Sequence, residues 1–164
     1  MEHQKVLGLS LNTRMVGLAV ICGTLLIDYQ ISLRKGAWSL NKRNKVLTSL
    51  QSWCTSYTII NIALATPHEN QSNDQINELL ESIKAHCRSN KIKISTYPPQ
   101  TVYRFCEENQ PRTKKEVMKK MCELYPELLT CFNKEKRNKN KYYVKLFDAV
   151  ALATIHSRKL KGKR

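Results

Sequence analysis

The 164-residue sequence predicts an α/β fold built on a five-stranded mixed sheet, antiparallel over its first three strands and parallel afterwards, flanked by helices. The first 33 residues hold three closely spaced apolar runs, which can pair only as an antiparallel meander because parallel neighbours need a long crossover. Further along, strand-like runs alternate with segments of helical periodicity, and such crossovers indicate parallel pairing. With 41% hydrophobic residues, a chain of this length can bury about two thirds of its unfolded surface.

The first half of the chain supplies four of the predicted strands and one helix. Three β-prone runs form the meander, at residues 6–11, 15–22 and 24–33, with a turn at 12–14. Apolar residues then recur at helical spacing, as at Val46, Leu50 and Cys54, and predict a helix over about 42–56. The β-branched run 58–65 is the fourth strand, which Pro67 ends.

The second half begins with one helix and the last strand. Ser72 with Gln75 three residues later has the form of a capping box, and apolar residues follow at helical intervals as far as Cys87. Residues 91–97 read as the fifth strand.

Helices dominate the remainder of the chain. A short helical piece is expected over 102–107, and Thr113 with Glu116 predicts the start of a helix that reaches about Leu124. The polar segment 133–141 is typical of a mobile basic loop, and a final helix covers about 144–160.

One domain spanning residues 1–164 is expected, since no repeat, linker or compositional break divides the chain. The N-terminus lacks the basic, apolar and small-residue pattern of a secretion signal, which favours a cytoplasmic location. Six well-separated cysteines form no Cys-x-x-Cys or Cys/His cluster, so they indicate neither a zinc site nor a disulfide framework.

The chain carries 28 Lys and Arg residues against 13 acids, a formal charge of +15, which points to a polyanionic partner. Most of the excess lies after residue 83. Three basic groups stand there: Arg112 to Lys120, Lys134 to Lys145, and a tail from Arg158 to Arg164. Phosphate is their natural counterion, and the alternative is a solvated face with a frayed terminus.

Two segments at the ends of the chain carry a resemblance to a known family. One is Val6-Leu7-Gly8-Leu9-Ser10-Leu11-Asn12-Thr13-Arg14 with the Gly17-containing run that follows it, and the other is Leu146-Phe147-Asp148-Ala149-Val150-Ala151-Leu152-Ala153. They resemble the first hairpin and the terminal helix of RuvC-like Holliday-junction resolvases, which belong to the ribonuclease-H-like superfamily. The segments Tyr97-Pro98-Pro99 and Thr113-Lys114-Lys115-Glu116-Val117 also match in order, so the resemblance spans nearly the whole chain.

The resemblance implies a site in which acids from the first strand, the fourth strand and the last helix hold two Mg²⁺ ions. Here Ser10 stands at the position of the first acid, and Ala65 or a neighbour stands at the second. Lys145 occupies a position that is often acidic in relatives, so Asp148 is the remaining catalytic candidate. One carboxylate and one hydroxyl give little negative charge for two dications, which predicts a degenerate site.

Asp148 shares an inward helical stripe with Val144, Ala151 and Ile155, and is expected to face the sheet near Ser10. The alternative is that Asp148 is an N-cap. Glu69 is a second candidate metal ligand, against the alternative of a solvated loop acid. His68 and His156 receive no catalytic role.

We expect nucleic-acid contacts from basic side chains in the first turn, at the start of the Lys-bearing helix and in the basic segment. These residues are Arg14, Arg112, Lys114, Lys115, Lys119, Lys136, Arg137, Lys139 and Lys141. Tyr142 and Tyr143 either stack on bases or staple the last helix to the core.

The leading hypothesis is a nucleic-acid-binding protein with absent or weak nuclease activity. Its expected partner is branched or duplex DNA, or structured RNA, and no membrane association or cofactor is expected. The first alternative is an active structure-specific endonuclease that uses Mg²⁺ or Mn²⁺ at Asp148 and Glu69. The second is a basic module that binds an acidic protein. Resemblance also suggests a homodimer.

Overall fold

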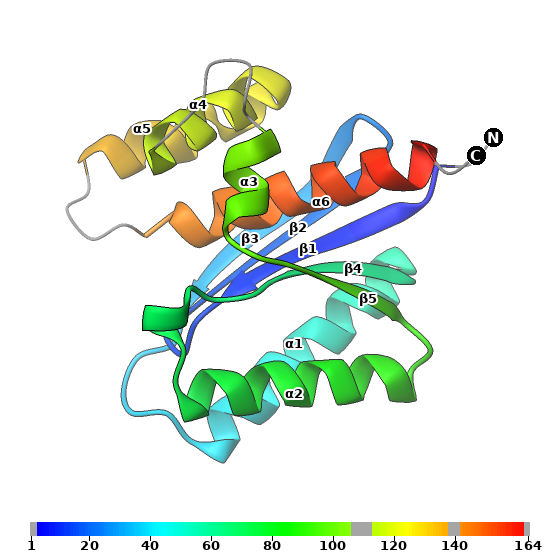
Figure 1. Cartoon of the computed structure of the whole chain (residues 1–164), viewed down its shortest axis with the longest axis vertical. Helices are drawn as coiled ribbons and strands as arrows, with labels where there is room; N and C mark the ends of the chain where they lie inside the picture. Colours follow the sequence, from blue (N-terminus) through cyan, green and yellow to red (C-terminus); the bar gives the residue numbers. More distant parts are fainter. Residues whose placement is uncertain (1–2, 106–112, 138–141, 163–164) are drawn as a thin grey trace.

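A five-stranded mixed sheet forms the centre of the structure, a computed structural model that describes residues 3–105, 113–137 and 142–162 (Figure 1). The strand order is β3-β2-β1-β4-β5. The first three strands, β1 (Lys5–Leu11), β2 (Met15–Cys22) and β3 (Leu25–Leu33), pair antiparallel. β4 (Asn61–Ala65) pairs parallel to β1, and β5 (Lys93–Tyr97) pairs parallel to β4. The predicted fold class is confirmed.

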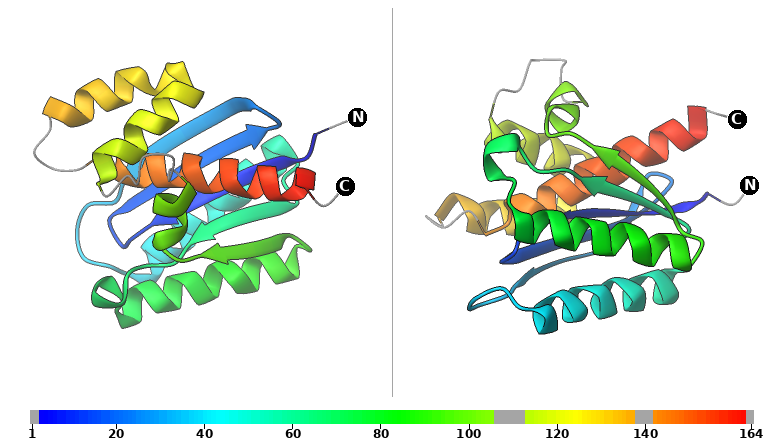
Figure 2. Two further views of the ribbon diagram at one scale, coloured as in Figure 1. Left: turned by 45° about the horizontal axis from the view of Figure 1, so that its top comes forward. Right: turned by 60° about the horizontal axis from the view of Figure 1, so that its bottom comes forward.

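Helices cover both faces of this sheet (Figures 1 and 2). One face carries α1 (Leu40–Tyr57) and α2 (Asp74–Ser89). The other carries α3 (Gln100–Phe105), α4 (Lys114–Leu124), α5 (Leu129–Arg137) and α6 (Val144–Gly162). Two short 3₁₀ helices, η1 (Glu69–Gln71) and η3 (Pro126–Leu128), complete the described elements. Burial on both faces explains why β1 and β4 are continuous apolar runs rather than alternating ones.

The central helix α6 lies directly on β1 and β2, and two glycines permit this approach. A Cβ added at Gly8 would lie 1.9 Å from the Ala149 carbonyl oxygen, and one at Gly17 would lie 2.4 Å from the Lys145 carbonyl oxygen. Any side chain at these positions would therefore strike the helix backbone. The two glycines fix the depth at which α6, and Asp148 on it, sits against the sheet.

The ends of two helices test the predicted capping boxes. Thr113 Oγ1 accepts a hydrogen bond from the Glu116 amide at 3.3 Å, which confirms the predicted start of α4. The prediction of Ser72 as the cap of α2 was wrong, because Asn73 caps this helix and its Oδ1 accepts from the Ile76 amide at 2.9 Å.

Other boundaries also differ from prediction; β5, for example, begins at Lys93 rather than at residue 91. Residues 58–60 do not join the fourth strand, because Thr58 ends α1 in the left-handed region at a φ of 55°. Residues 133–137, predicted as part of a loop, are helical in α5. The physical reason is burial: the Phe132 ring packs edge-on against Phe147, and buried Glu135 accepts a hydrogen bond from the Tyr143 amide at 2.8 Å.

The last helix is longer than expected, since α6 continues to Gly162 and includes part of the basic tail. The predicted loop residues 138–141 lie outside the described residues. Within the described ranges, none of the helices has the length and apolar character needed to cross a bilayer. The assignment of a single domain stays a prediction.

Candidate nucleic-acid interface

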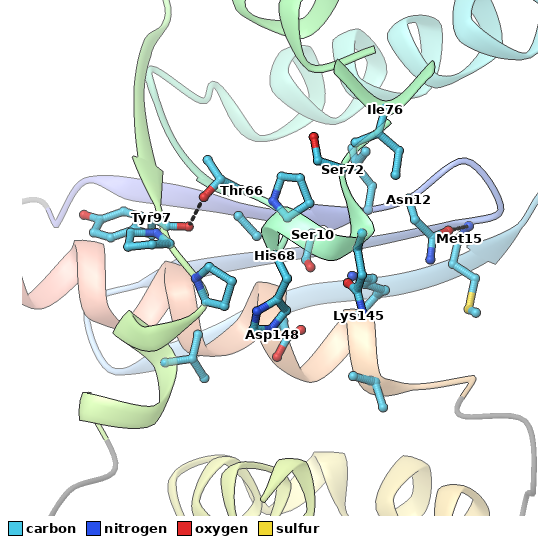
Figure 3. Close-up of a pocket in the computed structure, with 18 of the residues that line it drawn as sticks. Ser10, Asn12, Met15, Thr66, His68, Ser72, Ile76, Tyr97, Lys145 and Asp148 are labelled. Atoms are coloured by element: carbon cyan, nitrogen blue, oxygen red, sulfur yellow. Dashed lines mark hydrogen bonds between the residues drawn. The ribbon is translucent and has the colours of Figure 1, made fainter. Parts of the chain in front are cut away.

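A cavity of about 700 Å³ opens where β1, β4 and β5 end (Figure 3). Parallel strands place their carboxyl ends at one edge of a sheet, which is where α/β folds form their binding crevices. The β1–β2 turn, the η1 segment and the starts of α4 and α6 complete the walls. Ser10, Ala65, Lys145 and Asp148 all line this cavity, so the fold brings together the four positions at which the RuvC resemblance placed one site.

Asp148 is held by an ion pair within this cavity. The Lys114 ammonium lies 3.1 Å from Oδ2 and 3.5 Å from Oδ1 of the carboxylate. The N-cap alternative for Asp148 is wrong, because α6 begins at Val144 and Asp148 lies in its second turn, 8% exposed. The Lys114 ammonium also lies 5.7 Å from the centroid of the Tyr103 ring, a cation–π contact that helps to fix its position.

Ser10 forms part of the cavity floor. The residue is 1% exposed, and its hydroxyl has no hydrogen-bond partner among the described residues. It lies opposite Gly17 in the β1–β2 ladder, and Figure 3 shows it facing the same space as Asp148 and Lys145. Buried hydroxyls are nearly always paired, so this group is available to a polar ligand or an ordered water.

Lys145 also lines the cavity and interacts electrostatically with the same carboxylate. Burial lowers the pKa of Lys145 from its usual value; the negative charge of Asp148 opposes this effect and the positive charge of Lys114 adds to it. The two lysines and Asp148 therefore form one electrostatic cluster, to which α4 contributes one residue and α6 contributes two.

The described residues that line the cavity include three cationic side chains and one carboxylate, which gives a formal charge of +2. The third cation is Arg14, which is exposed in the β1–β2 turn. That turn is held by Asn12, whose Oδ1 accepts from the amides of Arg14 at 2.8 Å and Met15 at 2.7 Å. An anionic ligand is the chemistry that this lining favours.

The other predicted basic contacts lie outside the cavity. Lys115 and Lys119 are exposed on α4, and Lys136 and Arg137 are exposed on α5. The Lys136 ammonium lies over the Phe132 ring, 4.4 Å from its centroid. Arg112, Lys139 and Lys141 lie outside the described residues. Basic side chains on α4 and α5 thus occur on the same face of the sheet as α6.

Asp148 is the one carboxylate among the described residues that line the cavity. Glu69 is exposed on η1 and is not part of the lining, so the structure does not bring this candidate ligand to Asp148. Asp28 lies on β3, where its carboxylate accepts a hydrogen bond from the Tyr57 hydroxyl. Across residues 3–105, 113–137 and 142–162, no three His, Cys, Asp or Glu side chains gather as metal ligands would.

Sequence reasoning gave no role to the polar rim of the cavity. Asn70, Gln71 and Asn73 lie on its wall, beside His68. The signal was present, because this amide-rich segment follows the carboxyl end of a parallel strand.

Three remaining aromatic and histidine candidates have structural partners. The His156 Nδ1 lies 2.6 Å from the buried Tyr97 hydroxyl. Tyr143 packs against the core at the start of α6, in agreement with the staple alternative. Tyr142 contacts the Tyr143 ring edge-on, with 4.9 Å between centroids.

Solved structures of known proteins share this architecture. Thermus thermophilus RuvC superposes with a TM-score of 0.74 at 12% sequence identity, covering 98% of this chain and 97% of that protein. Its complex with a Holliday junction substrate gives 0.72 at 14% identity, covering 98% and 96%. This chain has a RuvC-like, ribonuclease-H-like fold.

A more distant RuvC-like neighbour is the yeast mitochondrial Holliday junction resolvase Ydc2, with a TM-score of 0.63 at 10% identity, covering 99% of this chain and 84% of that one. Comparison of the sequence with protein-family models and with curated proteins gives no match. The RuvC-like likeness therefore lies in the fold, including the order of strands that places Ser10 and Asp148 at one edge.

Proposed function

We propose that this protein binds nucleic acid, with branched or duplex DNA as its preferred partner, and that it does not use two-metal cleavage. The observation that carries the proposal is the lining of the cavity: three cations and one carboxylate, which is already paired with Lys114. Such a lining attracts phosphate. The RuvC-like fold supports the choice of partner, since the Thermus thermophilus protein with this fold was solved with a Holliday junction substrate.

The donor set does not fit a pair of divalent cations. Hard cations such as Mg²⁺ need several anionic oxygens, and two-metal catalysis needs ligands for both ions. The described lining offers one anionic ligand, the Asp148 carboxylate, with two lysines in the same lining; its other oxygen donors, such as the Ser10 hydroxyl and the side-chain amides of the rim, are neutral. We therefore assign no chemical step to a metal ion in this cavity. The homodimer and the cytoplasmic location stay predictions from the sequence.

Phosphate contacts make binding sensitive to salt, and this gives the test. With about five phosphate contacts, the slope of log K against log salt is about −4.5, so a rise from 50 to 200 mM salt weakens binding about 500-fold. The protein would be incubated with a four-way junction, a duplex and a single strand in Mg²⁺ or Mn²⁺, followed by gel and fluorescence-anisotropy assays. Binding without cleavage is the expected result.

Two outcomes contradict the proposal. Metal-dependent cleavage that is lost in Asp148→Asn would establish the alternative endonuclease. Absence of affinity for every nucleic acid at low salt would remove the binding function and leave an acidic protein as partner for the basic surface.

A further inference from the structure

Two lysines from different elements line the cavity together with the Asp148 carboxylate, and the Lys114 ammonium pairs with it at 3.1 Å. Lys114 is the first residue of α4 and Lys145 is the second residue of α6. The Lys114 side chain is 38% exposed and the Asp148 side chain only 11% exposed, so the ammonium lies on the outer side of the pair. A ligand that enters the cavity therefore meets the cation before it meets the carboxylate.

The Ser10 hydroxyl is an independent sign of a missing ligand. It is fully buried at the cavity floor and has no partner among the described residues. Leaving a buried hydroxyl unpaired is unfavourable, and a polar group that enters the cavity would remove this penalty.

The chemistry of the lining selects an anion with several acceptor atoms. Lysine and arginine side chains only donate hydrogen bonds, so a ligand of Lys114, Lys145 and Arg14 must offer acceptor atoms. A cavity of about 700 Å³ is larger than a lone inorganic ion requires and accommodates a nucleotide unit of a chain. A backbone phosphodiester fulfils both conditions, because it is anionic and its oxygens only accept hydrogen bonds. It also belongs to a polymer that reaches the exposed lysine and arginine side chains of α4 and α5.

We propose that this cavity binds one backbone phosphate of a nucleic acid through Lys114 and Lys145 above the Ser10 hydroxyl, without a divalent cation. The Lys114 ammonium acts as the built-in counter-cation of Asp148, and Asp148 is a positioning residue that orients this ammonium. The inference rests on the proposed nucleic-acid function and names the group within the cavity that the nucleic acid occupies.

The first experiment removes one charge at a time and measures four-way-junction affinity by fluorescence anisotropy in EDTA. Lys114→Gln and Lys145→Gln should each weaken binding about tenfold, since a charge-assisted hydrogen bond is lost. The matched control is Lys45→Gln, which removes the same charge from an exposed position on α1, on the opposite face of the sheet, and should stay within about twofold of the wild-type protein. Thermal unfolding of each variant shows whether it is folded.

The second experiment uses a substitution whose predicted effect has the opposite sign. Asp148→Asn raises the formal charge of the described cavity lining from +2 to +3, so junction binding in EDTA should become tighter, by about threefold or more. The double variant Lys114→Gln/Asp148→Asn leaves a neutral pair of similar shape and returns the formal charge of the described lining to +2. It should bind more tightly than Lys114→Gln but more weakly than the wild type, because the phosphate contact of Lys114 is lost. This double variant separates loss of the phosphate contact from exposure of an unpaired buried carboxylate.

Three results would overturn this inference while the proposed function stands: affinities of Lys114→Gln and Lys145→Gln equal to that of Lys45→Gln, weaker binding by Asp148→Asn in EDTA, or loss of wild-type binding on chelation. If the wild-type protein binds no nucleic acid at low salt, the proposed function itself fails, and the phosphate site fails with it.

Discussion

Replacing Gly8 with alanine should separate α6 from the sheet, since this glycine lies where the helix backbone meets β1. The added Cβ would lie 1.9 Å from the Ala149 carbonyl oxygen, 2.9 Å from its carbonyl carbon and 3.0 Å from Ala153 Cβ. To restore even a 3.0 Å contact, the carbonyl oxygen would have to retreat by 1.1 Å. That oxygen belongs to a helix backbone packed on two strands, so it cannot move without the whole element.

The expected loss of stability is at the upper end of the range for overpacked cores. Such substitutions cost about 1–3 kcal/mol, and a backbone obstacle favours a value of about 3 kcal/mol. Replacing glycine also stabilises by about 0.4–1 kcal/mol through the unfolded state, which leaves a net loss of about 2–2.5 kcal/mol. Since Asp148 immediately precedes Ala149 in α6, the shift should also weaken the pairing of Asp148 with Lys114.

Urea unfolding of Gly8→Ala and of Gly162→Ala, monitored by circular dichroism, tests this reasoning. A Cβ at Gly162 meets no atom within 4 Å, so the same substitution at the end of α6 should be neutral or slightly stabilising. If Gly8→Ala unfolds at the same free energy as the wild type, within about 0.5 kcal/mol, α6 does not lie on β1 as described.

Two further predictions concern α4 and the buried thiols. Thr113→Ala removes the cap of α4 and should lower the free energy of unfolding by about 1 kcal/mol, whereas Thr113→Ser should restore it; equal stability of all three proteins in urea would contradict the role of the cap. Burial raises the pKa of Cys54 to about 12, with a smaller contribution from Cys87, and burial raises the pKa of Cys87 to about 11. Their contribution to stability is therefore complete below pH 9 and falls as pH rises toward these values, by up to about 1.4 kcal/mol per pH unit for each thiol, because the unfolded chain ionises first. When urea unfolding is measured at several pH values between 8 and 11, the free energy of unfolding of Cys87→Ala should fall less with rising pH than that of the wild type. An identical pH dependence in both proteins would refute this assignment.

The mixed sheet, antiparallel over its first three strands and parallel afterwards, could be predicted because it follows from local patterns. Closely spaced apolar runs have to pair antiparallel, and helix crossovers have to connect parallel strands. The predictions that were wrong concern positions at which neighbouring residues compete for the same role or at which burial decides the conformation. Ser72 and Asn73 both suit a helix cap, and only the geometry of the entering chain selected Asn73. Residues 133–137 are polar on average, yet burial of Phe132 and Glu135 makes them helical.

The sequence by itself determined the inward position of Asp148, the positive charge and the scarcity of acids, because these are matters of periodicity and composition. Only the tertiary structure decided that Lys114, distant along the chain, pairs with Asp148, and that the Ser10 hydroxyl has no hydrogen-bond partner within the part of the chain that the structure describes. Side chains on separate elements meet through packing. Here two glycines allow α6 to approach the sheet closely enough for those side chains to share one cavity.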